Sequence, residues 1–272
     1  MENQNVKTGI MKLAIIGGGN LGSAIAEGLL KRDFYAPADI TITRRNFQTL
    51  AHLAAEGCHV HSDNRKAVEW ADLILLAVKP YNYAEVMEGF KDLLNPSRHV
   101  LISVITGIWI NQLREAAGKL LPVIRAMPNT AISIGKSMTC LSAKDVSPAQ
   151  ADYVKGLFDQ VGRTVYIDEK LMDAATVLGA CGTAFALRYV RANIQGGIEI
   201  GFDAKTASLI AAQTVLGAAD LLLTTGNHPE QEIDKVTTPR GCTIAGLNQM
   251  EHEGFSSSLI KGIRTSYEKI GK

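Results

Sequence analysis

The sequence predicts an α/β fold in which an N-terminal, doubly wound and mostly parallel sheet is followed by an all-α domain. From Lys12 to about Tyr166, short apolar runs alternate with amphipathic stretches, as they do in successive strand–helix–strand units. After Asp168 the β-branched runs disappear, and long stretches rich in Ala and Leu replace them. The 272 residues are enough for two hydrophobic cores.

The predicted domain boundaries follow from this change of pattern. A first domain of the α/β class is expected at residues 1–166, with a loose extension at 1–10. An all-helical domain is expected at residues 167–272.

Six apolar runs in the first domain are short enough to be strands. Their strong apolar character is typical of strands that helices cover on both sheet faces. They are Lys12–Gly17, Asp39–Thr43, His59–His61, Asp72–Val78, His99–Val104 and Val123–Met127. Helices between them are expected to begin near Asn20, Asn46, Asp63, Tyr81 and Ile108.

The second domain shows helical patterning throughout. Its predicted helices are Glu169–Leu178, Gly182–Ile200, Ala204–Thr225, Thr243–His252 and Ser256–Ile270. We expect Gly201 to end the second of these helices and Asp203 to cap the third. About a hundred residues of helix with few large aromatics bury little area alone, so we expect a homodimer through this domain. The alternative is an ordinary bundle packed on the first domain.

Composition excludes several classes of partner. The chain has 28 basic and 27 acidic side chains, and no run of Lys and Arg is longer than a pair. This gives no electrostatic footprint for nucleic acid or an anionic membrane. The most apolar stretches, Leu73–Val78 and Leu209–Leu223, are too short to cross a bilayer or are interrupted by Gln213 and Asp220, so no membrane span is expected. A small-molecule substrate is the default.

The N-terminus and the cysteines favour a cytoplasmic protein without a metal site. The first twelve residues lack the apolar core and cleavage site of a secretory signal. His59 and His61 alternate along a predicted strand, but no third ligand lies nearby, and a solvated edge explains them better. The four cysteines have no CxxC spacing and fit reduced thiols; they are Cys58, Cys140, Cys181 and Cys242.

A glycine-rich turn directly follows the first predicted strand. Residues 17–22, GGGNLG, match the pattern GxGxxG and open a helix. Gly17 permits the tight turn, Gly19 leaves room for a pyrophosphate, and Gly22 lets the helix approach the strand. The N-terminus of that helix offers N–H groups to phosphate oxygens. This context favours a Rossmann-type dinucleotide site; the alternative is a packing turn.

The end of the second predicted strand indicates which dinucleotide is bound. An NAD site usually has Asp or Glu there, but this chain has Arg44, Arg45 and Asn46 after Thr43. Two guanidinium groups can hold a 2′-phosphate by charge-assisted hydrogen bonds. NADPH is therefore favoured over NADH; the alternative is a solvated loop.

Three other loops carry polar groups in useful positions. Ala77–Pro80 and Met127–Thr130 follow predicted strands, at the sheet edge where doubly wound folds bind ligands, although either could be an ordinary strand exit. Near the C-terminus, Val236–Thr243 reads VTTPRGCT and precedes a helix. Thr243 is a good helix cap, and the N–H groups from Gly241 to Thr243 suit a carboxylate. Capping alone would also explain this loop.

These segments together resemble the pyrroline-5-carboxylate reductase family along nearly all of the chain after Met11. The matching pieces are IIGGGNLGSAIAEGLL, LLAVKPYNYAEV, SVITGI, VIRAMPNT, AAQTVLGAADLLL, the His228-Pro229 pair and VTTPRGCTIAGLNQME. The last is similar to the family signature VTSPGGTT. The resemblance implies reduction of 1-pyrroline-5-carboxylate to L-proline with NAD(P)H, by a dimer whose helical domains interlock and which can assemble further.

The resemblance also implies roles for individual residues. It places the pyrophosphate at Gly17, Gly19, Asn20 and Leu21, and the 2′-phosphate at Arg44, Arg45 and Asn46. It assigns the adenosine and ribose side to Asn64, Ala77, Val78, Lys79 and Pro80. Asn129 is expected near the nicotinamide and the substrate. Substrate binding falls to Thr238, Gly241, Cys242 and Thr243, and the Thr243 hydroxyl is the catalytic group that bonds the ring nitrogen.

The chain departs from the family pattern at three places. Arg240 stands where the family has the first of two glycines, so a positive φ there would be strained by about 1 kcal/mol. The loop then differs in shape, or the guanidinium adds a second anchor for the carboxylate. Residues 179–185 read GACGTAF in place of SGSGPAY, and Ala131 replaces a proline.

Two other functions remain open on the sequence. A dehydrogenase of the hydroxyacid or 6-phosphogluconate type would need a catalytic Lys on the first helix of the second domain. Lys170 starts that stretch, but Leu171–Leu187 contains no Lys. A non-catalytic NADPH-binding protein is the other possibility, if the altered Arg240 loop does not bind substrate.

Overall fold

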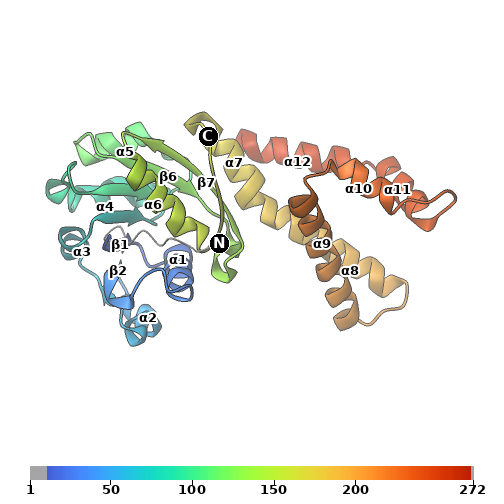
Figure 1. Ribbon diagram of the computed structural model, residues 1–272, viewed down its shortest axis with the longest axis horizontal. Helices are drawn as coiled ribbons and strands as arrows, with labels where there is room; N and C mark the ends of the chain where they lie inside the picture. The colour runs from blue at the N-terminus through green and yellow to red at the C-terminus, as the bar shows by residue number, and fades with distance from the viewer. Residues whose placement is uncertain (1–10, 271–272) are drawn as a thin grey trace, which may run out of the picture. The chain divides into compact units, whose positions relative to one another are not determined.

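The computed structural model describes residues 11–270, which form two compact units, the first ending at Ala180 and the second beginning at Cys181. The extension expected at residues 1–10 lies outside the described part. The first unit is built on a sheet with strand order β3-β2-β1-β4-β5-β6-β7-β8 (Figure 1). A mostly parallel sheet with flanking helices, followed by a helical unit, confirms the predicted fold class.

All six predicted strands are present and run parallel to their neighbours. They are β1 (Leu13–Ile16), β2 (Ile40–Thr43), β3 (His59–His61), β4 (Leu73–Leu76), β5 (Val100–Ser103) and β6 (Val123–Met127). Every residue of these strands is buried except in β3, which is the outermost strand on one side of the sheet. Full burial is the reason that their sequences are continuously apolar.

Two further strands complete the sheet and were not predicted. β7 (Ser137–Lys144) runs antiparallel to β6, and β8 (Gly162–Tyr166) pairs parallel to β7. In β7 the buried side chains of Ser137 and Thr139 share a hydrogen bond between their hydroxyls, 3.2 Å long. A strand that buries hydroxyls leaves no apolar run in the sequence.

Helices cover both faces of the sheet (Figure 1). Alternate residues of β1 point to opposite faces: Leu13 and Ile15 pack in one core cluster, Ala14 and Ile16 in the other. The first cluster includes residues of α1 (Asn20–Leu30), α2 (Ala51–Glu56) and α6 (Pro148–Asp159). The second includes residues of α3 (Asn64–Trp70), α4 (Tyr83–Glu88) and α5 (Ile110–Ala117).

The helices of the second half differ from the prediction at one junction. Helices Glu169–Leu178 and Gly182–Ile200 were expected to be separate. Instead α7 (Met172–Ala175) continues through a π-helical turn, Thr176–Cys181, into α8 (Gly182–Glu199). The chain widens its helical turn at this junction instead of ending the helix.

The rest of the second unit is helical throughout. It contains α9 (Ala204–Thr225), α10 (Pro229–Lys235), α11 (Cys242–His252) and α12 (Phe255–Lys269); α10 was not predicted. Asp203 caps α9 as expected, because its carboxylate accepts from the N–H groups of Lys205 and Thr206 at 3.0 and 3.1 Å. Gly201 has φ +114° and separates α8 from α9.

Candidate active site

The carboxyl ends of three neighbouring strands meet at one edge of the sheet. Ile16 of β1 lies in register with Thr43 of β2 on one side and with Leu76 of β4 on the other. The strand order reverses here, since the chain passes from β1 to β2 and β3 and then returns to place β4 on the opposite side of β1. Open α/β sheets bind ligands at such a switch point.

The glycine turn begins at this edge, and its three glycines have different surroundings. A Cβ added to Gly17, whose φ is +111°, would lie 2.6 Å from the Ala77 carbonyl oxygen. One added to Gly22 would lie 2.3 Å from the Gly17 carbonyl oxygen. A Cβ on Gly19 would meet nothing within 4 Å. A packing turn explains Gly17 and Gly22 but not the open space at Gly19, which is where a pyrophosphate approaches the backbone.

The start of α1 is also prepared for an anion. Gly19 is its N-cap residue and supplies no side-chain hydrogen bond, so no cap side chain covers the first-turn N–H groups, which include those of Asn20 and Leu21. The first turn contains no acidic residue. The residues present therefore fit the pyrophosphate of a dinucleotide.

Arg44 lies against the glycine turn. Its Nη1 donates to the Gly18 carbonyl at 3.1 Å, and the N–H of Gly18 donates to the Thr43 carbonyl at 2.7 Å. Arg45 and Asn46 follow as exposed side chains. The end of β2 thus presents two guanidinium groups and no carboxylate beside the turn.

Asn64 and the Ala77–Pro80 loop reach the same edge. The Thr43 hydroxyl donates to Asn64 Oδ1 at 2.7 Å, and so fixes the amide at the start of α3. The N–H of Ala77 donates to the Ile16 carbonyl at 2.9 Å, which places the loop beside Gly17. The structure therefore brings the predicted cofactor residues of three strand ends together. The contact by which Thr43 holds Asn64 was not predicted from the sequence.

His61 is a second residue that sequence reasoning did not place at this edge. It ends β3 in register with Thr43, and its Nδ1 accepts from the N–H of Asp63 at 3.2 Å. Partial burial lowers the pKa of His61, because desolvation disfavours the imidazolium. Within residues 11–270, no group of three or more His, Cys, Asp and Glu side chains is placed to hold a metal ion.

Asn129 follows β6, at the same edge of the sheet. Its Oδ1 accepts from the N–H of Ala131 at 3.1 Å, and its Nδ2 donates to the Gly179 carbonyl at 3.3 Å. The side chain thus links the strand end to the π-helical turn.

The VTTPRGCT loop lies in the second unit and forms a tight turn. The N–H of Gly241 donates to the Thr238 carbonyl at 2.9 Å, Pro239 occupies the second position, and Arg240 has φ +60°. Proline followed by a positive φ defines a type II turn, whose third position normally requires Gly or Asn. Arg240 therefore adopts a positive φ, the conformation that would be strained for this side chain.

The helix cap predicted at Thr243 is wrong. Gly241 is the N-cap of α11, and Thr243 lies in the first turn of that helix. A Cβ on Gly241 would lie 2.5 Å from Thr238 Oγ1, so only glycine lets this hydroxyl lie against the backbone. Because Gly241 provides no side-chain cap, the first N–H groups of α11 have no cap bond from that residue and suit an anionic group.

Comparison with known proteins supports both halves of this description. A family model described as pyrroline-5-carboxylate reductase dimerisation matches residues 169–272. A second model, described as NADP oxidoreductase, coenzyme F420-dependent, matches residues 12–107.

Full-length relatives agree with these models. Pyrroline-5-carboxylate reductase 1 of Dictyostelium discoideum is 45% identical over 269 residues, covering 94% of this chain and 49% of the relative. Pyrroline-5-carboxylate reductase 2 of the same organism is 41% identical, covering 96% and 92%. The chain thus spans about half the length of the first relative and nearly all of the second. The crystal structure of Plasmodium falciparum pyrroline carboxylate reductase with NADP bound has a TM-score of 0.84 at 25% identity, covering 95% of this chain and 96% of that one.

The fold, the glycine turn and the matching models define an oxidoreductase that uses a nicotinamide dinucleotide. Within that class, the chain belongs to the pyrroline-5-carboxylate reductase family. The resemblance seen in the sequence is confirmed.

Proposed function

We propose that this chain reduces 1-pyrroline-5-carboxylate to L-proline and prefers NADPH to NADH. The observation that carries the proposal is the chemistry of the two loops. One sheet edge offers an open cradle at Gly19 beside Arg44, and the start of α11 carries the family signature with its uncapped N–H groups. The substrate and the product are proposed because the relatives are pyrroline-5-carboxylate reductases.

The 2′-phosphate of the cofactor distinguishes NADPH from NADH. Arg44 already lies on the glycine turn, and Arg45 and Asn46 extend the same edge into solvent. Guanidinium groups bind phosphate through paired, charge-assisted hydrogen bonds. A carboxylate at this position would favour a ribose hydroxyl and repel the phosphate.

The substrate is a small cyclic imine with one carboxylate. In the proposal, the N–H groups of Gly241, Cys242 and Thr243 hold the carboxylate, the Thr238 hydroxyl supports the loop, and the Thr243 hydroxyl bonds the ring nitrogen. In the proposal, the Arg240 guanidinium is a second anchor for that carboxylate, beside the backbone N–H groups.

Catalysis by this chain consists mainly of orientation. The bound cofactor supplies the hydride, and the imine carbon is already electrophilic. The protein holds the two reactants in a near-attack arrangement, which contributes up to about 7–11 kcal/mol in favourable model systems. Thr243 fixes the direction of the ring nitrogen. In the proposal the substrate reacts as the iminium, whose ring nitrogen already carries a proton. Hydride addition to the carbon moves the C=N π electrons onto that nitrogen and gives the amine, so no side chain acts as an acid or a base.

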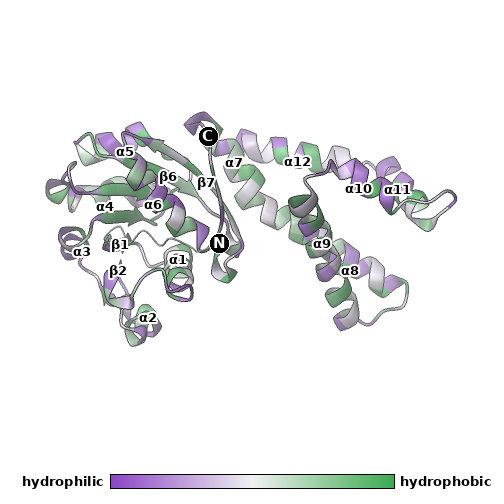
Figure 2. Cartoon of the chain, in the orientation of Figure 1, coloured by the Kyte–Doolittle hydropathy of each residue, from purple (hydrophilic) through white to green (hydrophobic). Residues whose placement is uncertain are grey.

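The helical unit supports a homodimer, with higher assembly possible on the same surface. Among the described residues from Cys181 to Ile270, only Ala207 and Ala211 are buried. Leu209, Leu216 and Leu223 recur every seven residues along α9 and are 69, 50 and 59% exposed. Figure 2 shows such hydrophobic segments along this helix. A second copy of the chain is the partner that the dimerisation model favours.

The same apolar helices bear on the membrane question. Glu169–Glu199 and Ala204–Thr225 are long and apolar enough to cross a bilayer, which differs from the expectation of no span. Helices with little burial in one chain and small residues along their length also suit a protein interface. We propose that a partner chain covers them and that the protein works in the cytoplasm, where its four unpaired cysteines stay reduced.

One assay tests the reaction. Purified protein with 1-pyrroline-5-carboxylate should oxidise NADPH faster than NADH and form L-proline, whereas NADP⁺ with β-hydroxyacids should give no turnover. Replacing Thr243 by Ala should lower kcat at least tenfold with NADPH affinity preserved. Thr237→Ala is the matched control, because the Thr237 hydroxyl donates to the Ile233 carbonyl within its own turn. Turnover of a β-hydroxyacid in place of the imine would reject the proposal.

A second experiment tests the cofactor preference. The double substitution Arg44→Ala and Arg45→Ala should weaken NADPH binding about 10–100-fold and leave NADH binding unchanged, since each lost bond to a charged group is worth about 1.5–3 kcal/mol. Lys31→Ala with Arg32→Ala removes a basic pair just after α1 and serves as the control. Equal loss of both cofactors would show that the arginines do not read the 2′-phosphate.

A further inference from the structure

Residues 176–181 form a π-helical turn, whereas the other long helices among residues 11–270 are α-helical. A π-turn widens the helix and is rare, and such turns are frequently found at functional sites. It persists only where surrounding contacts favour it over the ordinary α-helix. One contact to this turn comes from Asn129, in the loop after β6.

Asn129 uses its polar groups in two directions. Within its own loop, its N–H donates to Ser137 Oγ, its carbonyl accepts from Ile132, and its Oδ1 accepts from Ala131, each at 3.1 Å. These bonds hold the side chain in one orientation. Only Nδ2 points out of the loop, and it donates to the Gly179 carbonyl in the π-turn at 3.3 Å.

Gly179 is not required by packing. A Cβ added there would meet nothing within 4 Å, so the backbone faces open space. Glycine is among the least favourable residues inside a helix, and a glycine that no neighbour requires often lets a ligand approach the backbone. Because Asn129 follows β6, and β6 runs parallel to β5, β4 and β1, this open backbone is tied to the sheet edge that carries the glycine turn.

We propose that Asn129 is a positioning residue that holds the π-turn at Gly179, and that the backbone at Gly179, beside which a Cβ would find open space, forms one wall for the nicotinamide ring. The inference rests on the proposed function. The family resemblance implies that Asn129 lies near the nicotinamide and the substrate, whereas the inference gives its amide a different role, which is to hold the backbone of the π-turn. The amide acts through Gly179, since both ends of it already have protein partners.

The substitution Asn129→Asp isolates the tether. Aspartate has the same shape and keeps an oxygen for the Ala131 N–H, but it replaces the Nδ2 donor with an acceptor that faces the Gly179 carbonyl. The matched control is Asn95→Asp. Asn95 Oδ1 accepts from the Ser97 N–H at 2.9 Å in the same kind of turn, but it precedes β5 and so lies at the opposite sheet edge.

Three measurements on the full chain separate the possible roles. They are kcat and KM with 1-pyrroline-5-carboxylate, the affinity for 2′,5′-ADP, which lacks nicotinamide, and the fluorescence of NADPH bound at saturation. For Asn129→Asp we expect kcat to fall at least tenfold and the bound-nicotinamide fluorescence to change. The 2′,5′-ADP affinity should stay within twofold, and Asn95→Asp should match the wild type.

Two outcomes would overturn the inference. A rise in KM with unchanged kcat and unchanged fluorescence would make Asn129 a direct substrate ligand. Wild-type values throughout would remove it from the site. If Asn129→Asp loses 2′,5′-ADP binding, Gly179→Ala is the variant to use, because its methyl group fits the structure and the Asn129 hydrogen bond is kept. For this variant kcat should fall and the NADPH fluorescence should change. Wild-type values would show that the Gly179 backbone does not lie against the nicotinamide ring.

Failure of the proposed reaction is distinguishable. Wild-type protein that binds NADPH but does not reduce the imine would reject the function. The fluorescence response of Asn129→Asp would still decide whether the amide positions the nicotinamide wall.

Discussion

The two units of this chain bury their apolar residues to very different extents. The sheet unit encloses two clusters, one on each face, and β1, β4 and β5 contain no exposed residue. The helical unit leaves most of its Leu and Ile side chains exposed and buries only Ala207 and Ala211 among its described residues. The first unit therefore has a core of its own, whereas the second needs another surface to complete one. Substitutions in the helical unit should therefore affect dimerisation most, and substitutions in the sheet unit should affect stability or cofactor binding.

The largest effect should come from charging the exposed face of α9. The double substitution Leu209→Glu and Leu216→Glu should raise the dimer dissociation constant at least 100-fold, because two carboxylates would be desolvated in the interface. Light scattering after size-exclusion chromatography measures this. Leu120→Glu is the control, since Leu120 is 78% exposed in the sheet unit. A double variant that stays dimeric at low concentration would contradict the role of this face.

The next effect separates two glycines of one turn. Gly22→Ala should lower the free energy of unfolding by about 2 kcal/mol, because its methyl group would lie 2.3 Å from the Gly17 carbonyl oxygen and the backbone must shift. Gly19→Ala should leave stability unchanged and weaken NADPH binding, because its methyl group enters open space. Urea unfolding and cofactor titration test the pair. Similar stability loss in both variants would mean that Gly19 serves packing alone.

A smaller effect is expected in the helical unit. Arg240→Gly should raise the free energy of unfolding by about 1 kcal/mol, because glycine adopts the φ of +60° without strain. Arg264→Gly, in the exposed middle of α12, should lower it by about 1 kcal/mol instead. If the Arg240 guanidinium also anchors the substrate carboxylate, KM rises in the first variant only. Destabilisation by Arg240→Gly would indicate that the side chain makes a stabilising contact.

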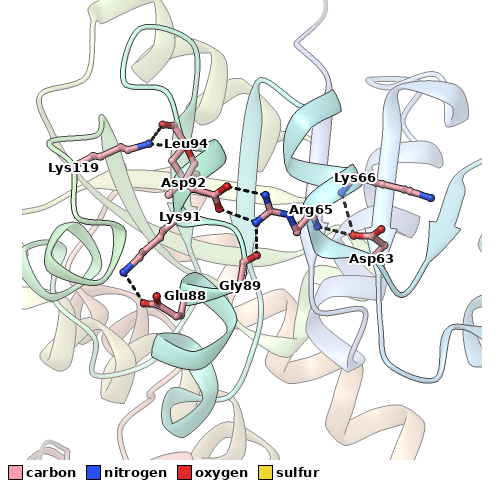
Figure 3. A network of polar contacts seen from close by, with 9 residues as sticks. All are labelled: Asp63, Arg65, Lys66, Glu88, Gly89, Lys91, Asp92, Leu94 and Lys119. Atoms are coloured by element: carbon pink, nitrogen blue, oxygen red, sulfur yellow. Dashed lines mark hydrogen bonds and ion pairs between the residues drawn. The ribbon is translucent and has the colours of Figure 1, made fainter.

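The smallest effect concerns the surface of the sheet unit (Figure 3). Arg65 binds both carboxylate oxygens of Asp92 at 2.7 Å, and this hydrogen bonding lowers the pKa of Asp92 from 3.8 to about 2. A lowered carboxyl pKa stabilises the fold above pH 4, and this contribution is lost as the pH falls from about 4 to about 2. Asp92→Asn should therefore be slightly less stable at neutral pH, and the difference should vanish in acid.

Acid unfolding at low ionic strength measures this difference. Both groups of the pair are solvent-exposed, so added salt should shrink the effect. Parallel acid unfolding curves for the two proteins would show that the pair contributes nothing to stability.

Elements whose sequence reflects a single physical requirement could be predicted from the sequence. Continuous apolar runs predicted β1 to β6, since buried parallel strands require them. β7 could not be found in this way because it buries hydroxyls at Ser137 and Thr139, which satisfy each other only once the strand is in place. Strand β8 carries exposed Val165 and Tyr166 and lacks a buried face in the pattern.

In the candidate site too, local motifs could be predicted from the sequence, and contacts between distant residues could not. The glycine turn is a local motif, so its position was readable from the sequence. The contact of Thr43 with Asn64, and that of Asn129 with Gly179, join residues 21 and 50 positions apart, and no local pattern signals them. The π-turn was not predicted either, and its contact with Asn129 comes from a loop that is distant in the sequence. The misplaced cap shows a smaller limit: Gly241 and Thr243 are both good capping residues, and backbone geometry chooses between them.

The order of strands in the sheet has a consequence for biosynthesis of the chain. All residues proposed to hold the adenosine half of the cofactor lie between Gly17 and Pro80, in segments that follow strands β1 to β4, which are neighbours in the sheet. Because translation proceeds from the N-terminus and domains fold as they emerge, this part of the cofactor site can form before the loop that ends at Thr243 is synthesised. A nascent chain could thus recruit its nucleotide before it has any means of recognising the molecule to be reduced.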